Sequence, residues 1–313
     1  MLVSALKGIA TYVPGLYRST RGSTGGSVSA RYCYGVWMRH LCMVQRASLP
    51  VRFDVVAELG PGDSLGLGLA ALLTGARTYY AFDIVPYTRN DRNARVLREL
   101  VEIFRRRVPV PDAQEFPEVL PRLQDWSFPG KVLTEAHLNQ TLDPARVAAI
   151  ERALLNIEGS RGGPIEIRYE APWNAAESIR ENSVDLIFSQ AVLEHIDDLE
   201  GTYSAMHRWL RPDGVLSQQI DFRAHYLDRR WNAHWTYSDL VWKLIRGRRP
   251  YLLNRQPLSA HLSWLERMGF EVVRILKEQK VSAVRREQLA RRFRDLSDED
   301  LTTSSVYIQA RKR

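Results

Sequence analysis

Apolar positions along the chain follow two different periods, and the changes of period mark the predicted elements. Between Arg31 and Ala47 apolar side chains recur every three or four residues, which predicts a helix with one buried face. The next run, 53–59, is largely apolar and stops at Gly60-Pro61-Gly62, which is typical of a buried strand that ends in a glycine turn. A helix over 65–73 and a strand over 78–84 follow, so the pattern begins as strand, turn, helix and strand.

Seven strands are predicted in all, separated by helices or by longer connections. They cover 53–59, 78–84, 165–169, 184–189, 215–222, 270–276 and 304–310. Strands that alternate with helices predict an α/β fold with a Rossmann-like, doubly wound and mostly parallel sheet, and we expect its last strand to be antiparallel. The predicted domain spans 51–313, after an N-terminal helical extension at 1–50 and with a helical insertion at about 90–160.

Three further segments carry their own patterns. Residues 1–30 are predicted to be loosely structured, because a run rich in glycine and serine occupies 19–27. The segment 282–293 is predicted as a basic helix because arginines recur along it, and 238–246 is predicted as a helix that packs leucines and a tryptophan onto the core.

Composition narrows the class of protein without indicating a function. The chain has 313 residues, of which 45% are hydrophobic and 26% charged, ordinary values for a globular protein. We expect no transmembrane helix, since no apolar stretch reaches roughly 18 residues, and no signal peptide, since the N-terminus lacks a cleavage site. Cys33 and Cys42 show no zinc-site spacing and suit free thiols in the cytoplasm.

The net charge of +8 admits several kinds of partner. Such a balance is typical of proteins that bind nucleic acid, an anionic membrane face or an acidic substrate. Because the basic residues are spread along the chain and interleaved with Asp and Glu, an arginine-rich composition without a specific partner explains the charge equally well.

The turn after the first strand favours a nucleoside ligand without phosphates. A dinucleotide fingerprint needs a glycine three residues after Gly62, whereas Gly66 comes one residue later. Asp63 would also repel a pyrophosphate. Two acids at the turn, Glu58 and Asp63, favour a cationic ligand such as S-adenosylmethionine, with Gly60 and Gly62 allowing its close approach. The alternative is a turn whose glycines only allow tight packing of strand and helix.

A further acid, Asp83, ends the neighbouring strand, where a carboxylate can accept two hydrogen bonds from a ribose diol. Together with the segments 182–196 and 209–214, these motifs resemble those of class I S-adenosylmethionine-dependent methyltransferases. The likeness covers about 51–89 and 164–310. It implies the fold, S-adenosylmethionine as cofactor and methyl transfer as the reaction.

The resemblance also implies roles for residues around the cofactor. Gly60 and Gly62 would line the methionine part, Asp83 would bind the ribose, and Glu58 would act through the turn and the ligand's amino group, with Asp63 as the second acid of the turn.

Four residues at the next strand ends complete the expected cofactor site. Ser189 and Gln190 would border the methyl-donor pocket. Asn174 would bond the adenine amino group and Trp173 would stack on the ring, although Trp173 serves equally well as a core anchor.

Histidines near the same edge of the sheet are the candidate general bases. Methyl transfer to a hydroxyl requires removal of a proton, and histidine suits that task near neutral pH. We expect His195 or His225 to act as base, with Asp221 and Glu194 as orienting or binding groups; a structural role remains open for each histidine.

A metal ion is not predicted. In ubiquinone-pathway O-methyltransferases a Glu-x-x-Glu-His pattern holds magnesium. Glu194 and His195 match the end of that pattern, but Ala191 stands at its first carboxylate position, so one ligand is missing. Glu194 is the residue that would overturn this expectation.

The predicted reaction is S-adenosylmethionine-dependent O-methylation of a hydroxyl on a sugar or glycan, with an acidic acceptor favoured by the positive charge. Aromatic and arginine side chains gather between Asp221 and Tyr251, which suits a polyhydroxylated acceptor. That stretch is similar to bacterial methyltransferases linked to surface-polysaccharide synthesis. The alternatives are an RNA or nucleotide methyltransferase, because such side chains also stack nucleobases, and a non-catalytic Rossmann-like scaffold.

Overall fold

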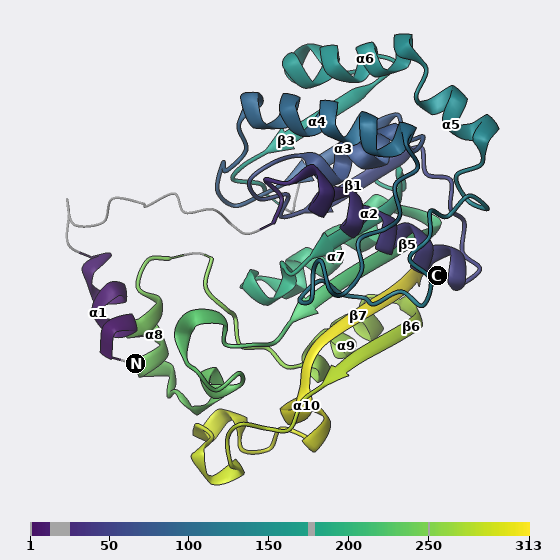
Figure 1. Ribbon diagram of the computed structural model, residues 1–313. Coiled ribbons are helices and arrows are strands. Elements are labelled where there is room, and N and C mark those ends of the chain that lie inside the picture. Colours follow the sequence, from purple (N-terminus) through teal and green to yellow (C-terminus); the bar gives the residue numbers. More distant parts are fainter. Residues whose placement is uncertain (1, 13–25, 175–178, 250) are drawn as a thin grey trace.

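A twisted seven-stranded sheet forms the centre of the computed structural model, which describes residues 2–12, 26–174, 179–249 and 251–313 (Figure 1). Its strand order is β3-β2-β1-β4-β5-β7-β6. The strands are β1 (Val55–Leu59), β2 (Thr78–Phe82), β3 (Glu166–Glu170), β4 (Val184–Gln190), β5 (Leu210–Asp221), β6 (Phe270–Gln279) and β7 (Thr303–Lys312). All seven predicted strands are therefore confirmed.

Strand directions follow the doubly wound pattern. Strands β1 to β5 pair in parallel, whereas β7 runs antiparallel to both β5 and β6. The expected antiparallel last strand is thus confirmed. The chain leaves β1 toward β2 on one side and later returns to β4 on the other, so the strand order reverses between β1 and β4. In open parallel sheets such a reversal opens a crevice at the carboxyl ends of the strands.

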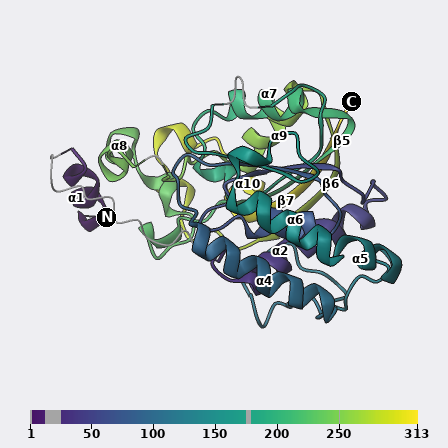
Figure 2. The same ribbon diagram turned by 90° about the horizontal axis from the view of Figure 1, so that it is seen from above.

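Two layers of helices cover the sheet on opposite sides (Figure 2). One layer holds α2 (Ala30–Arg46), α3 (Gly66–Leu73), α4 (Asn90–Arg105), α5 (Glu135–Thr141) and α6 (Pro144–Leu155). The other holds α7 (Leu199–Trp209) and α9 (Leu258–Arg267). Each layer packs into its own apolar core. Burial of these apolar faces is the main favourable term for the fold.

Helix α2 belongs to the first core rather than standing apart from it. Ser29 begins the helix as its N-cap, because its hydroxyl accepts a hydrogen bond from the Tyr32 amide at 3.3 Å. Trp37 and Met38 are fully buried against the sheet layer. The expected division between 1–50 and 51–313 therefore falls within one continuous core.

Two short elements differ from the expectation. Residues 2–10, expected to be loosely structured, form helix α1 (Leu2–Ala10), while 13–25 lie outside the described residues. Helix α1 packs beside α8 (Asp239–Arg246), away from the sheet (Figure 1). A side chain at Gly8 would lie 2.0 Å from the Leu244 carbonyl oxygen, so only glycine allows this approach.

The predicted basic helix at 282–293 is wrong. The segment forms two short 3-10 turns, η5 (Arg286–Gln288) and η6 (Arg291–Phe293). The Ala290 amide donates to the Trp235 carbonyl oxygen at 3.0 Å, which removes this amide from any helical ladder. Leu289 and Phe293 pack in a small core with Trp235. Tertiary packing thus outweighs the local arginine pattern.

No helix among the described residues is long and apolar enough to cross a membrane.

Gly68 allows α3 to approach β2 closely, and we predict that Gly68→Ala destabilises the fold. A methyl group there would lie 1.9 Å from the ring of the buried Tyr79. Overpacking of this kind costs about 1–3 kcal/mol. Urea unfolding measures the free energy of unfolding. Gly130→Ala is the matched control, because nothing lies within 4 Å of its added methyl group. Equal stability of the two variants would contradict this packing argument.

Candidate functional site

A cavity of about 550 Å³ opens where the strand order reverses. This volume is in the range of small-molecule sites. Its floor comes from the ends of β1, β2 and β4, including Glu58, Asp83 and Gln190. The cavity therefore occupies the edge of the sheet at which parallel strands end and ligands bind.

The glycine turn after β1 has a backbone conformation that other residues rarely adopt. Gly60 and Gly62 have φ values of +66° and +69°. The Gly60 amide donates to the Phe82 carbonyl oxygen at 2.8 Å, which ties the turn to the end of β2. A side chain at Gly60 would meet Val192 at 2.5 Å. Both glycines line the cavity, as the sequence predicts.

The N-terminus of α3 has no amide groups free for a phosphate in the stretch 63–66. The amides of Asp63 and Ser64 donate to the Ser27 hydroxyl at 2.9 and 3.3 Å. The Leu65 amide donates to Asn93 Oδ1 at 2.9 Å. Dinucleotide-binding folds place a pyrophosphate on these amides. Their occupation here independently favours a ligand without phosphates.

Glu58 is buried beneath the turn and lines the cavity floor. Burial raises the pKa of its carboxyl to about 8, the hydrogen bond from the Tyr79 hydroxyl lowers it, and the charge of Asp83 raises it further. Tyr79 donates that bond at 2.5 Å. A carboxyl group of this kind gains from a cation bound in the cavity, because the cation compensates its desolvated charge.

Asp63, the other acid of the turn, does not line the cavity. Its carboxylate lies 3.3 Å from the Arg92 guanidinium, and Asp63 is not among the cavity-lining residues. The expectation that its charge acts directly on the ligand thus has no support in the position of the side chain.

Asp83 ties the two neighbouring strand ends together. Its Oδ1 accepts from the Ile84 amide at 2.7 Å, and its Oδ2 accepts from the Gly62 amide at 3.2 Å. Burial raises its pKa, while these amides lower it. Asp83 lines the cavity beside the glycine turn, where the sequence places the ribose.

The four remaining predicted cofactor residues divide into two groups. Trp173 and Gln190 line the cavity. Trp173 also packs on Phe82 and Trp209, at ring distances of 5.7 and 5.8 Å, so it anchors the core as well. Ser189 is fully buried and donates to Gln218, and Asn174 is not among the lining residues, so neither is placed at the cavity wall.

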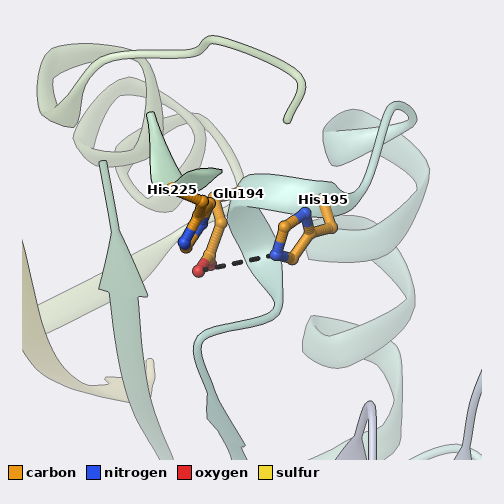
Figure 3. A group of neighbouring side chains, drawn as sticks. All are labelled: Glu194, His195 and His225. Carbon is orange, nitrogen blue, oxygen red and sulfur yellow. Dashed lines mark ion pairs between the residues drawn. The ribbon is translucent and has the colours of Figure 1, made fainter. Parts of the chain in front are cut away.

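Glu194, His195 and His225 come together at the cavity wall (Figure 3). Glu194 and His195 lie in η2 (Leu193–His195) directly after β4, and His225 begins η3 (His225–Leu227) after β5. His195 Nε2 lies 4.0 Å from Glu194 Oε1, and the two imidazole rings stack with centroids 5.4 Å apart. Both histidines line the cavity, and the carboxylate lies behind them.

Burial dominates the electrostatics of this cluster. It lowers the pKa of His195 to about 4, with the neighbouring His225 acting in the same direction. It also raises the pKa of Glu194 well above its usual range, and the charge of Asp221 adds to that effect. His195 is therefore a neutral imidazole at neutral pH, the form that accepts a proton or binds a metal.

Asp221 bonds to an arginine instead of a histidine. Burial raises the pKa of its carboxyl, but hydrogen bonds from Arg223 outweigh that effect and leave the pKa below its usual value. The Arg223 guanidinium lies 2.6 Å from Asp221 Oδ2 and also pairs with Glu118 of the insertion. The insertion thus reaches the edge of the site, although none of the lining residues lies between 90 and 160.

Several residues that line the cavity were not predicted from the sequence. Ser4 and Lys7 of α1 line the cavity, as do Ser27 and Tyr32. Their local sequence carries no motif, because their position depends on α1 packing against α8 and on α2 packing against the sheet. Arg249 and Tyr251 also line the cavity, and they lie in the basic, aromatic stretch that the sequence singles out.

Comparisons with known proteins give one family match. Residues 142–217 match a family described as a methyltransferase domain. No curated protein matches the chain.

Several solved structures are similar to the chain. One is an S-adenosylmethionine-dependent methyltransferase from Mesorhizobium loti, at 15% identity and a TM-score of 0.41, covering 87% of this chain and 98% of that one. A second, a putative enzyme of the same description from Listeria monocytogenes, has 13% identity, a TM-score of 0.42 and coverages of 90% and 98%. A phosphoethanolamine N-methyltransferase from Haemonchus contortus, in complex with S-adenosylhomocysteine, has 15% identity, a TM-score of 0.42 and coverages of 88% and 53%. These likenesses are too distant to assign a substrate.

Three features define the class: the matched domain, the strand order, and a glycine turn followed by amides that already donate within the protein. The protein is an S-adenosylmethionine-dependent methyltransferase with a Rossmann-like fold. Its cofactor is S-adenosylmethionine. The cavity fits this ligand, because carboxyl groups and glycines with positive φ meet at its floor, beside apolar and aromatic side chains.

We predict that Asp83→Ala lowers the affinity for S-adenosylmethionine by at least about tenfold, since it removes the carboxylate that we expect to accept bonds from the ribose diol. Isothermal titration calorimetry measures this affinity. Asp91→Ala is the control, because Asp91 is exposed and pairs only with Arg89 among the described residues. Unchanged affinity of Asp83→Ala would refute the ribose role.

Glu58 is expected to make the stability of the ligand-free protein fall as pH rises. The pKa of Glu58 is about 8 in the folded chain and about 4.3 when unfolded, so the folded state holds an extra proton between these values. The stabilising contribution is complete below about pH 4.3 and is lost as pH rises through about 8.

Glu58→Gln should flatten this decline in urea unfolding measured from about pH 5 to pH 8. Glu99→Gln is the control, because the Glu99 side chain is 53% exposed on α4. If Glu58→Gln keeps the wild-type slope, another group controls the decline.

Proposed function

We propose that the protein O-methylates a hydroxyl group on a sugar or glycan, with an acidic acceptor preferred. The observation that carries this proposal is the cavity itself. Two neutral imidazoles, those of His195 and His225, line the same cavity as the cofactor turn at Gly60–Gly62. A basic group near the methyl donor is what a hydroxyl acceptor needs, because its proton must leave as the oxygen attacks.

The wall formed by α1, Arg249 and residues 251–253 supports an acidic, polyhydroxylated acceptor. Lys7 and Arg249 bring positive charge to the cavity, and Tyr251 brings an aromatic ring. Arginine and lysine suit carboxylate or phosphate groups, while aromatic rings with polar tips suit the faces and hydroxyls of sugars.

The reaction is an in-line displacement at the sulfonium methyl group. The acceptor oxygen forms the new bond to carbon, the carbon–sulfur bond breaks, and sulfur keeps the electron pair, which yields S-adenosylhomocysteine. The proton of the acceptor hydroxyl leaves at the Glu194–His195–His225 cluster. Positioning of donor and acceptor in one enclosed cavity supplies the remaining rate enhancement.

The alternative acceptor, RNA or a nucleotide, has weaker support. The arginines of 282–293 do not form a continuous basic stripe, because this segment is not a helix. Arg286 pairs with Asp298, and Arg292 pairs with Asp239. These two pairs neutralise part of the positive charge in this region locally, which reduces an electrostatic footprint for nucleic acid.

A methyl-transfer assay with labelled S-adenosylmethionine tests the acceptor class. We predict transfer to glycans that contain uronic acids, with a rate that changes by less than about threefold between roughly 50 and 200 mM salt. Binding of RNA through several phosphates would instead weaken by orders of magnitude over the same range. Transfer to RNA with that steep dependence, and none to glycans, would replace this proposal with the alternative.

Two histidine variants serve as controls in the same assay. His195→Ala should lower turnover by about 10²–10⁴-fold, the usual contribution of a group that removes a proton, and leave the affinity for S-adenosylmethionine within about threefold. His207→Ala should keep wild-type turnover, because His207 packs on Phe270 near the end of α7 and does not line the cavity.

A further inference from the structure

The chain supplies a third ligand atom where the sequence pattern lacks one. The absence of a carboxylate at Ala191 is the reason for expecting no metal at Glu194 and His195. In the fold, His225 arrives from the next strand end and lies beside both residues (Figure 3). One ligand atom from each of the three side chains lies within 4.8 Å of the other two.

The buried carboxylate of Glu194 has no protein partner for its charge. Glu194 is 2% exposed, and within the described part of the chain no hydrogen bond of ordinary geometry reaches either of its oxygens; the nearby amides of Glu194 and Asp221 lower its pKa but do not offset the effect of burial. Arg223, the nearby cation, is already held by Asp221 and Glu118. A buried carboxylate without a partner is strongly unfavourable unless a cation or a proton neutralises it. Figure 3 shows this carboxylate beside the two histidines, with a dashed line to His195.

We propose that Glu194, His195 and His225 bind one divalent first-row transition metal ion of the Zn²⁺ type. Two imidazoles and one carboxylate form a donor set that suits Zn²⁺, Co²⁺ or Fe²⁺, whereas Mg²⁺ and Ca²⁺ prefer oxygen ligands. Three protein ligands also leave a coordination position open, as catalytic zinc sites do.

The separation of the donors is compatible with such an ion. Tetrahedral ligand atoms about 2.0–2.1 Å from a metal lie roughly 3.4 Å from one another. His195 Nε2 and Glu194 Oε1 are 4.0 Å apart, so small side-chain rotations bring them to that spacing. His225 is exposed and begins a short 3-10 turn, which leaves its ring room to turn.

The role of this ion in the reaction rests on the proposed function, whereas binding of the ion does not. Because His195 and His225 line the cavity, an ion between them faces the acceptor. An acceptor hydroxyl at the open position would lose its proton to solvent water more easily, since a bound divalent metal lowers the pKa of an oxygen ligand. The resulting alkoxide attacks the methyl group, and the sulfur leaves with the electron pair. The two histidines then hold the ion at which the acceptor hydroxyl loses its proton, so the proton still leaves at the Glu194–His195–His225 cluster.

The test measures ion binding alone, without an acceptor. The full-length protein is stripped with a chelator and titrated with Co²⁺, followed by visible absorption, and with Zn²⁺, followed by calorimetry. We expect one ion per chain, with weaker binding by at least about tenfold in Glu194→Gln and in His225→Ala. His207→Ala, on the far end of α7, should bind like the wild type. Affinity for S-adenosylmethionine, measured on each variant, reports whether the variant is folded.

Two results would overturn the metal site: no stoichiometric ion on the wild-type protein, or folded Glu194 and His225 variants that bind as tightly as the wild type. These results are separable from a failure of the proposed function. Ion binding without glycan methylation would refute the acceptor alone, and glycan methylation by an ion-free protein would refute only the role of the ion in the reaction.

Discussion

The glycine turn after β1 and the carboxylate of Asp83 hold each other in place. The Gly62 amide donates to Asp83, and the Gly60 amide donates to the end of β2, so the two strand ends form one rigid corner. Both bonds require φ values that side chains disfavour. The cavity floor, the position expected for the ribose and the start of α3 all follow from this corner. A bulkier residue at either glycine would move each of them together.

The inside and the outside of the molecule have opposite electrostatic character. The chain carries a net charge of +8, yet the groups buried at the cavity floor and wall include Glu58, Asp83 and Glu194. Burial pushes the pKa of all three carboxyls upward. A cationic cofactor at the first two, and a metal ion at the third, would compensate charges that the protein leaves without cations of its own. The cavity thus combines buried carboxyl groups at its floor with Lys7 and Arg249 at its wall, and the two sets suit different ligands, the cofactor and the acceptor.

The strands and the cofactor corner could be predicted because their signals are local. Most of the strands contain a short apolar run, and the corner needs glycines directly after a strand and an acid after the next one. The pairing of Asp63 with Arg92 could not be predicted, since Arg92 belongs to α4 and reaches the turn only in the folded chain. The missing 282–293 helix has the same cause, because contacts with Trp235 decide its conformation.

The Glu194–His195–His225 cluster shows where reasoning from motifs stops. A pattern within one strand–turn segment, such as the one that ends in Glu194 and His195, can identify only ligands that are close in sequence. His225 lies 30 positions beyond His195, but parallel neighbours β4 and β5 end at the same edge of the sheet. Residues that follow adjacent parallel strands therefore meet whatever their separation along the chain. A sequence search for ligands in such folds should combine the segments after neighbouring strands, and for this chain that combination supplies the third donor.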